Sequence, residues 1–206
     1  MSELDHVVLA TPDLAGTVAE VARLVGVEPV AGGRHTGRGT RNYLLGLGNG
    51  AYLEIIGPDP EQAEPEQPRP FGIDDLTEAR LAAWLIRVTD IDAAVVESRA
   101  AGYDPGDVSD LSRTTPDGRI LQWRLTFPVG AEPTRVVPAI IDWGDTDHPS
   151  GELPVVPLLS LEAVHPDPAS VMERLKAVGA QLTVRTGNRP ALIATVGDAA
   201  DPITLL

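Results

Sequence analysis

Hydrophobic positions in the first part of the chain follow two different periods. Within Leu4–Ala10, Val7 and Leu9 fall on one face of an extended chain and His6 falls on the other, because side chains alternate along a strand. The apolar residues that follow recur at helical spacing, and they are Leu14, Val18, Val21, Ala22 and Val25. The pattern therefore predicts a strand followed by an amphipathic helix.

The predicted helix has clear start and stop residues, and three more strands follow it. Asp13 is placed to cap the helix, and Gly26 is placed to end it. Alternating apolar positions predict strands at Glu28–Gly32, Arg41–Leu47 and Ala51–Gly57. On the last of these strands Glu54 shares a face with Tyr52, which directs its carboxylate to the same side as that ring.

This order of one strand, one helix and three strands carries motifs of a known superfamily. The first strand lies in LDHVVLATPDL, the last lies in AYLEII, and GGRHTGRGTRNYLLGLGNG runs between them. The pattern resembles a βαβββ module of the vicinal oxygen chelate, or glyoxalase, superfamily, and within it the glyoxalase-like domain branch. The resemblance implies a mixed α+β fold, in which repeated βαβββ modules form a curled, cup-shaped sheet with a cavity on its concave side.

Two further modules are expected after the first. Residues 1–57 form the first module, 58–75 a linker rich in Pro and Glu, 76–150 the second module and 151–206 a compressed third one. The stretch Pro58–Pro70 is either a surface connector or a lid over the cavity. Because such modules close a sheet in pairs, the third either extends the sheet or pairs with another chain, so a homodimer is one hypothesis.

The second module repeats the pattern of the first. A short helical turn is predicted at Leu76–Ala82, followed by a strand at Ala83–Val88 and a helix that runs from Ile91 to Gly102. Aligning the capping residues Asp90 and Asp13 places Ala83 at the position of His6. The further strands are predicted at Gly106–Thr114, Ile120–Thr126 and Pro138–Trp143. On the last of them, the counterpart of Glu54 is Ile140, or Asp142 after a shift of two residues.

The third module is predicted from the same succession of patterns. Its five elements are Leu158–His165, the helix Pro168–Val178, Gln181–Thr186, Ala191–Val196 and Ile203–Leu206.

Composition excludes several classes of partner. The 206 residues carry 30 Asp and Glu against 16 Lys and Arg, which gives a net charge of −14. Such a chain repels nucleic acid and anionic membranes, so we expect neither as a partner. With no Cys, disulfides and thiolate chemistry are excluded. The amino terminus lacks the pattern of a signal peptide, so a cytoplasmic location is expected, and the many Gly, Pro and Ala residues suggest a bacterial source.

The resemblance also implies a chemistry. In metal-dependent members of the superfamily the His and Glu of the module, here His6 and Glu54, bind a divalent ion, and an imidazole with a carboxylate suits Zn, Ni, Fe or Mn. Stable sites need at least a third ligand. Its candidates are His35, Asp142, His148 and Glu162, of which His148 is the best placed in the sequence. Ala83 supplies no second-module ligand.

Two functions follow from these residues. The first is a metal-assisted lyase or isomerase, in which Glu54 moves a proton on a substrate with two adjacent oxygens. The second is a metal-free protein that binds or sequesters a small molecule, with Glu54 paired to Arg87 or Arg124. In either case the ligand-binding residues are expected to be His35, Asn42, Tyr52, Arg87 and Trp143.

Overall fold

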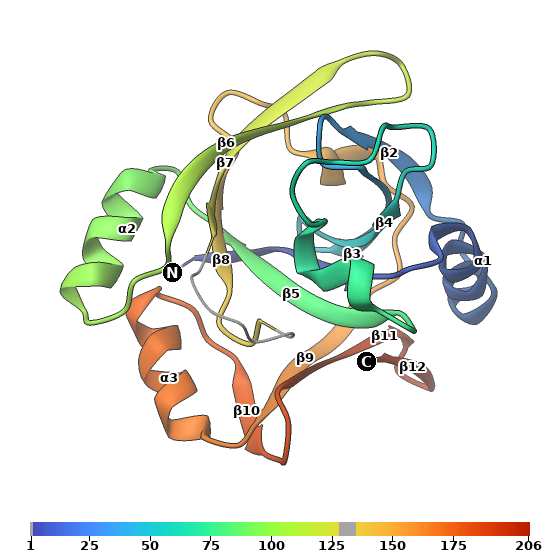
Figure 1. Cartoon of the computed structure of the whole chain (residues 1–206). Coiled ribbons are helices and arrows are strands. Elements are labelled where there is room, and N and C mark those ends of the chain that lie inside the picture. Colours follow the sequence, from blue (N-terminus) through green and yellow to red (C-terminus); the bar gives the residue numbers. More distant parts are fainter. Residues whose placement is uncertain (1, 128–134) are drawn as a thin grey trace.

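The computed structural model describes residues 2–127 and 135–206 and is built around a closed eight-stranded barrel. The first half contains β1 (Glu3–Ala10), α1 (Leu14–Val25), β2 (Val30–His35), β3 (Thr40–Gly48) and β4 (Ala51–Pro58). The second half contains β5 (Arg80–Arg87), α2 (Ile91–Ala100), β6 (Asp107–Thr114), β7 (Ile120–Phe127) and β8 (Ala139–Asp142). Their order around the barrel, β1-β4-β3-β2-β6-β7-β8-β5, is the same in both halves, and α1 and α2 lie outside the barrel on opposite sides (Figure 1).

The pairing of β1 with β5 shows that the two halves are related by an approximate twofold axis. The axis passes between Val7 and Trp84, which lie opposite each other. On either side of it lie two further pairs, His6 with Leu85 and Val8 with Ala83, and the twofold rotation superimposes one pair on the other. Ala83 is therefore the equivalent of His6, as the aligned helix caps predicted. Each strand also carries one bulged residue at equivalent positions, Asp5 in β1 and Ala82 in β5.

Alternation along the strands separates two apolar clusters. The cluster inside the barrel includes Val8, Ile56, Leu85, Ile141 and Trp143. The cluster outside lies between the barrel, the helices and the second sheet, and it includes Val7, Leu53, Trp84 and Ile140. Faces predicted for β1 and β4 are the faces observed, so the side of each strand that carries His6 and Glu54 is the interior.

Helix α1 forms where its sequence predicts it. The Asp13 side chain accepts a hydrogen bond from the Gly16 backbone N–H at 3.0 Å, and Gly26 ends the helix at a positive φ of 71°. Leu14 and Val21 are buried. This apolar stripe packs the helix on the outer face of β4.

Residues after the barrel form a separate four-stranded sheet. Its elements are β9 (Leu158–His165), α3 (Pro168–Ala177), β10 (Thr183–Thr186), β11 (Ala191–Asp198) and β12 (Asp201–Leu205). The succession of elements is the predicted one, but the strand order is β10-β9-β11-β12. In each barrel half the first strand pairs with the fourth, whereas β9 pairs with β10 and β11. The unit is therefore not a third copy of the barrel half.

The second sheet and the segment that leads into it both contact the outside of the barrel. The Leu81 N–H donates to the carbonyl of Leu206 at 2.8 Å, and the Gly46 N–H donates to the carbonyl of Pro154 at 2.8 Å. Ala163 and Leu192 of this sheet belong to the outer apolar cluster. Within the described residues, none of the helices has the length and apolar character needed to cross a membrane.

Between β4 and β5 the structure differs from the prediction of a helical turn at Leu76–Ala82. A short 3-10 helix lies earlier, at Pro70–Asp75, and β5 already begins at Arg80. Proline suits the first position of a helical turn, which explains the earlier start. The preceding linker packs on the loop between β2 and β3, where the Asp59 N–H and Arg69 Nε donate to the Gly39 carbonyl at 2.9 and 3.0 Å.

Candidate active site

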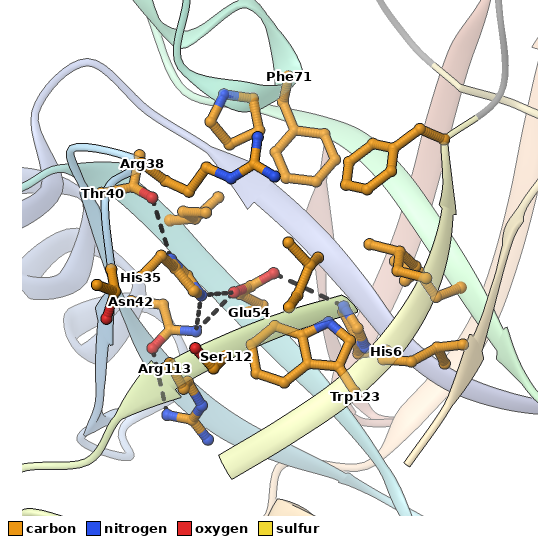
Figure 2. Close-up of a pocket in the computed structure, with 18 of the residues that line it drawn as sticks. His6, His35, Arg38, Thr40, Asn42, Glu54, Phe71, Ser112, Arg113 and Trp123 are labelled. Atoms are coloured by element: carbon orange, nitrogen blue, oxygen red, sulfur yellow. Dashed lines mark hydrogen bonds and ion pairs between the residues drawn. The ribbon is translucent and has the colours of Figure 1, made fainter. Parts of the chain in front are cut away.

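A cavity of about 240 Å³ lies inside the barrel. Polar side chains from β1 to β4 form one wall, and they include His6, His35, Asn42 and Glu54. The opposite wall is apolar and contains Leu85, Trp123, Leu125, Ile141 and Trp143. Figure 2 shows the Glu54 carboxylate between the two imidazoles, with Phe71 and Arg38 above it.

Glu54 is the centre of the polar wall. Its Oε1 accepts a hydrogen bond from Asn42 Nδ2 at 2.6 Å, and the same oxygen lies 3.6 Å from His35 Nε2. Its Oε2 lies 3.6 Å from His6 Nε2. Glu54 is only 7% exposed, so these partners take the place of the water that the carboxylate has lost on burial.

His35 is held as a neutral imidazole. Burial lowers the pKa of His35, although the nearby Glu54 charge acts in the opposite direction. Its Nδ1 lies 3.0 Å from Thr40 Oγ1, and its Nε2 lies 3.4 Å from the Asn42 amide nitrogen. The two contacts fit a tautomer in which Nδ1–H donates to Thr40 and Nε2 accepts from Asn42.

His6 is oriented by the residue that precedes it. In a regular strand Asp5 would point away from His6, but Asp5 is the bulged residue of β1. Its Oδ1 accepts from His6 Nδ1 at 2.5 Å. This contact leaves His6 Nε2 directed toward Glu54, and the ring stacks on Tyr52 with centroids 4.6 Å apart.

Asp5 is itself fixed by three donors. Besides His6, Trp143 Nε1 donates to Asp5 Oδ2 at 3.0 Å, and His148 Nε2 donates to the same oxygen at 2.9 Å. Burial alone would raise the pKa of Asp5, but the hydrogen bonds from His148 and His6 outweigh it and hold that pKa well below its usual range. Asp5 is therefore a buried anion that orients His6.

The ligand-binding residues expected from the sequence divide into two groups. His35, Asn42, Tyr52 and Trp143 line the barrel cavity. Arg87 lies instead beside a surface hollow between β5, α2 and α3, where its Nη2 donates to Glu3 Oε2 at 2.7 Å. The cause is that Arg87 is the last residue of β5, beyond the part of the strand that faces the cavity.

The candidate third metal ligands lie away from the pair of His6 and Glu54, except for His35. The His148 ring is bound at Nε2 by Asp5 and at Nδ1 by Ser150. Asp142 accepts hydrogen bonds from the backbone of Ile91 and Gly144. Glu162 pairs with Arg185 on the second sheet.

Arg124, the other arginine considered as a partner for Glu54, pairs with Asp92 at 2.7 Å. The carboxylate of Glu54 is instead held by Asn42, with the two imidazoles beside it.

The donor set does not fit a complete divalent metal site. Within the part of the chain that the structure describes, no three His, Asp or Glu side chains are arranged to hold one ion. The strand register places Ala139, which lies opposite Leu85, at the position equivalent to Glu54 opposite Val8. The sequence predicts Ile140 or Asp142 as the counterpart of Glu54, and this prediction is wrong. Ile140 faces the outer cluster, and the residue at the equivalent position is Ala139.

Several side chains of the candidate site were not identified from the sequence, among them Asp5, Arg113 and Phe71. Asp5 was missed because a bulge breaks the alternation. Arg113 was missed because β6, DVSDLSRT, has no apolar period that assigns its faces. Phe71 lines the cavity from a backbone with φ 61°, which is uncommon for a residue other than glycine. The linker thus contributes a wall of the cavity through Pro70 and Phe71.

Comparison with known proteins first defines the class. The barrel of two βαβββ halves is the vicinal oxygen chelate fold, and a structure described as a hypothetical protein from Staphylococcus aureus superimposes with a TM-score of 0.72 at 11% identity over 99% of this chain and 98% of that one. A methylmalonyl-CoA epimerase from Mycobacterium tuberculosis gives a TM-score of 0.45 at 20% identity, over 70% of this chain and 88% of its own. No curated protein sequence matches the chain significantly.

The family follows from the sequence model. The model described as Glyoxalase-like domain matches residues 4–179, so the chain belongs to this family. Membership and fold place it among the small-molecule enzymes and binding proteins of the vicinal oxygen chelate superfamily.

Proposed function

We propose that the barrel cavity is the active site of a small-molecule isomerase or lyase in which Glu54 takes a proton from a substrate carbon, with no metal ion required. The observation that carries this proposal is the Glu54 carboxylate, which lines the cavity with one oxygen bound by Asn42 and the other facing His6 Nε2. A general base must reach its substrate and be held in one orientation. The position of Glu54 at the cavity and its hydrogen bond from Asn42 support this role.

The proton transfer balances within the site. A carbon next to a carbonyl group loses its proton to Glu54 Oε2, and the electron pair of the broken C–H bond moves to the carbonyl oxygen as an enolate. Return of the proton at the same or a neighbouring carbon completes an isomerisation, whereas loss of a leaving group completes an elimination. Because Asp5 binds His6 Nδ1, the Nε2 of His6 is available to exchange the proton with Glu54.

The test is hydrogen exchange at carbon. The protein is incubated in D2O with a panel of small aldehydes, ketones and 2-oxo acids, and deuterium incorporation is followed by proton NMR. We expect Glu54→Gln to slow exchange by about 10² to 10⁴-fold, the usual contribution of a general base. Glu162→Gln, which changes an outer carboxylate of the second sheet, is the matched control and is expected to retain the wild-type rate.

A metal-free binding protein is the second candidate, and the aromatic wall favours it. Trp123 and Trp143 lie with ring centroids 5.3 Å apart in the cavity, and Phe71 lies near its mouth. Such a wall binds apolar ligands without chemistry. Quenching of tryptophan fluorescence by a ligand that shows no exchange in wild type, and binds Glu54→Gln equally well, would support this function over the enzyme.

A further inference from the structure

Arg113 is a buried cation at the cavity. It belongs to β6, is only 4% exposed and lines the same space as Glu54. Its guanidinium occupies the room left by the missing side chain of Gly32 on β2, because a Cβ there would lie 2.5 Å from Arg113 Nη1. The fold therefore keeps a position without a side chain beside this group.

The charge of Arg113 has little direct compensation. Its Nη1 donates to Asn42 Oδ1 at 3.4 Å, a long contact, and within residues 2–127 and 135–206 no carboxylate forms an ion pair with it. Burial lowers the pKa of Arg113, as expected for a cation that has lost water, although Tyr52 and Glu54 partly offset this effect. A buried charge that has one long hydrogen bond and no ion pair is costly, and an anion bound beside it would lower that cost.

Other arginines of this acidic chain show the contrast. Arg34, Arg69 and Arg124 each bind a carboxylate of the protein. Arg38 is a second cation of the cavity, and it lies across the mouth beside Phe71 (Figure 2). Among the described residues, neither Arg113 nor Arg38 forms an ion pair, which they share with Arg80 and Arg135, but only Arg113 and Arg38 line the cavity.

We propose that the ligand of the cavity is a small carboxylate whose anionic group pairs with Arg113. This inference rests on the proposed function and names its substrate class. Asn42 connects the two charged groups, since its Oδ1 accepts from Arg113 and its Nδ2 donates to Glu54 at 2.6 Å. A carboxylate on Arg113 therefore places the adjoining carbons within reach of the Glu54 base, while an apolar remainder packs on Trp123 and Trp143.

The test compares two probes of equal shape, phenylacetate and the neutral phenylacetamide. Affinity is measured by tryptophan fluorescence and calorimetry with the whole chain. We expect wild type to bind phenylacetate about tenfold or more tightly than the amide, because an arginine and carboxylate pair is a strong, charge-assisted contact. Arg113→Met is expected to remove this preference, and the matched control Arg124→Met, at an exposed surface pair, is expected to keep it.

Further variants separate this inference from the proposed function. Glu54→Gln removes a neighbouring negative charge, so it is expected to keep or strengthen phenylacetate binding while it slows carbon exchange by about 10² to 10⁴-fold. If Arg113→Met does not fold, Arg113→Lys replaces it and is expected to weaken the preference, because Lys lacks the planar fork. Equal affinity of wild type for the two probes, including no binding of either, overturns the inference, as does equal behaviour of the Arg113 and Arg124 variants.

Discussion

The two halves of the barrel share a backbone and differ in chemistry. Around the twofold axis, the positions of Asp5, His6 and Glu54 in the first half correspond to Ala82, Ala83 and Ala139 in the second. Even the bulge is repeated, yet only the bulge of β1 carries a functional group. The fold therefore supplies two equivalent sets of positions, and this chain uses one of them for polar groups and the other for packing.

This difference explains why the two walls of the cavity differ in polarity. A ligand meets a carboxylate and two imidazoles on one wall and mainly apolar side chains on the other, to which β6 adds the cation of Arg113. A site with four ligands around the axis would treat both ends of a small molecule alike, whereas this one distinguishes a polar end from an apolar body. The first two predictions below alter one half so that it becomes more like the other, and the third tests the polar wall by itself.

The largest expected effect comes from making the first bulge like the second. Asp5→Ala removes the acceptor of His6, Trp143 and His148 and leaves buried donors without a partner. We expect the free energy of unfolding to fall by about 3 to 5 kcal/mol, measured by urea denaturation. Asp92→Ala, which breaks an exposed pair, is expected to have a much smaller effect on the free energy of unfolding. Similar losses in both variants would show that Asp5 has no special structural role.

An intermediate effect is expected from making the second half like the first. Ala83→His adds an imidazole at the twofold equivalent of His6. We expect this imidazole to act as a third metal ligand together with His6 and Glu54. We expect zinc at about 100 times its dissociation constant to stabilise this variant by about 2.7 kcal/mol, measured as a rise in melting temperature. Ala83→Phe, a bulky residue without a ligand atom, should show no such rise. An equal zinc effect in wild type would contradict the one-sided site.

The smallest effect concerns the pH dependence of the polar wall. Burial lowers the pKa of His35 below its ordinary value of 6.5, so below that pH the unfolded chain binds a proton that the folded chain does not. The contribution of His35 to the free energy of unfolding is therefore constant above pH 6.5. Below pH 6.5 it falls as the pH decreases, by at most about 1.4 kcal/mol per pH unit. His35→Gln is expected to lack this part of the pH dependence in denaturation curves at several pH values. A curve parallel to wild type would refute the assignment.

The sequence predicts the parts of this site that depend on local period. Alternation along β1 and β4 places His6 and Glu54 on the inner faces, and the aligned caps Asp13 and Asp90 give the equivalence of His6 and Ala83. These features depend only on the repeat of a strand and the start of a helix, which neighbouring residues determine.

The remaining features depend on pairing between distant strands. No local pattern reveals the bulge that turns Asp5 toward His6, because a bulge is defined by the partner strand. Arg87 follows the alternation of β5, yet it is the last residue of that strand, at the rim of the barrel, and its side chain pairs with Glu3. The second sheet has the expected succession of elements, but succession does not determine which strands pair, so its order β10-β9-β11-β12 was not foreseen.

The hydrogen bond from Leu81 to the carbonyl of Leu206 has a practical consequence for handling the protein. Leu81 adjoins Ala82, the bulged residue of β5, and the family match ends at residue 179. A purification tag fused directly after Leu206, or removal of the last residues, would disturb this hydrogen bond to β5, a strand that contributes to one wall of the cavity.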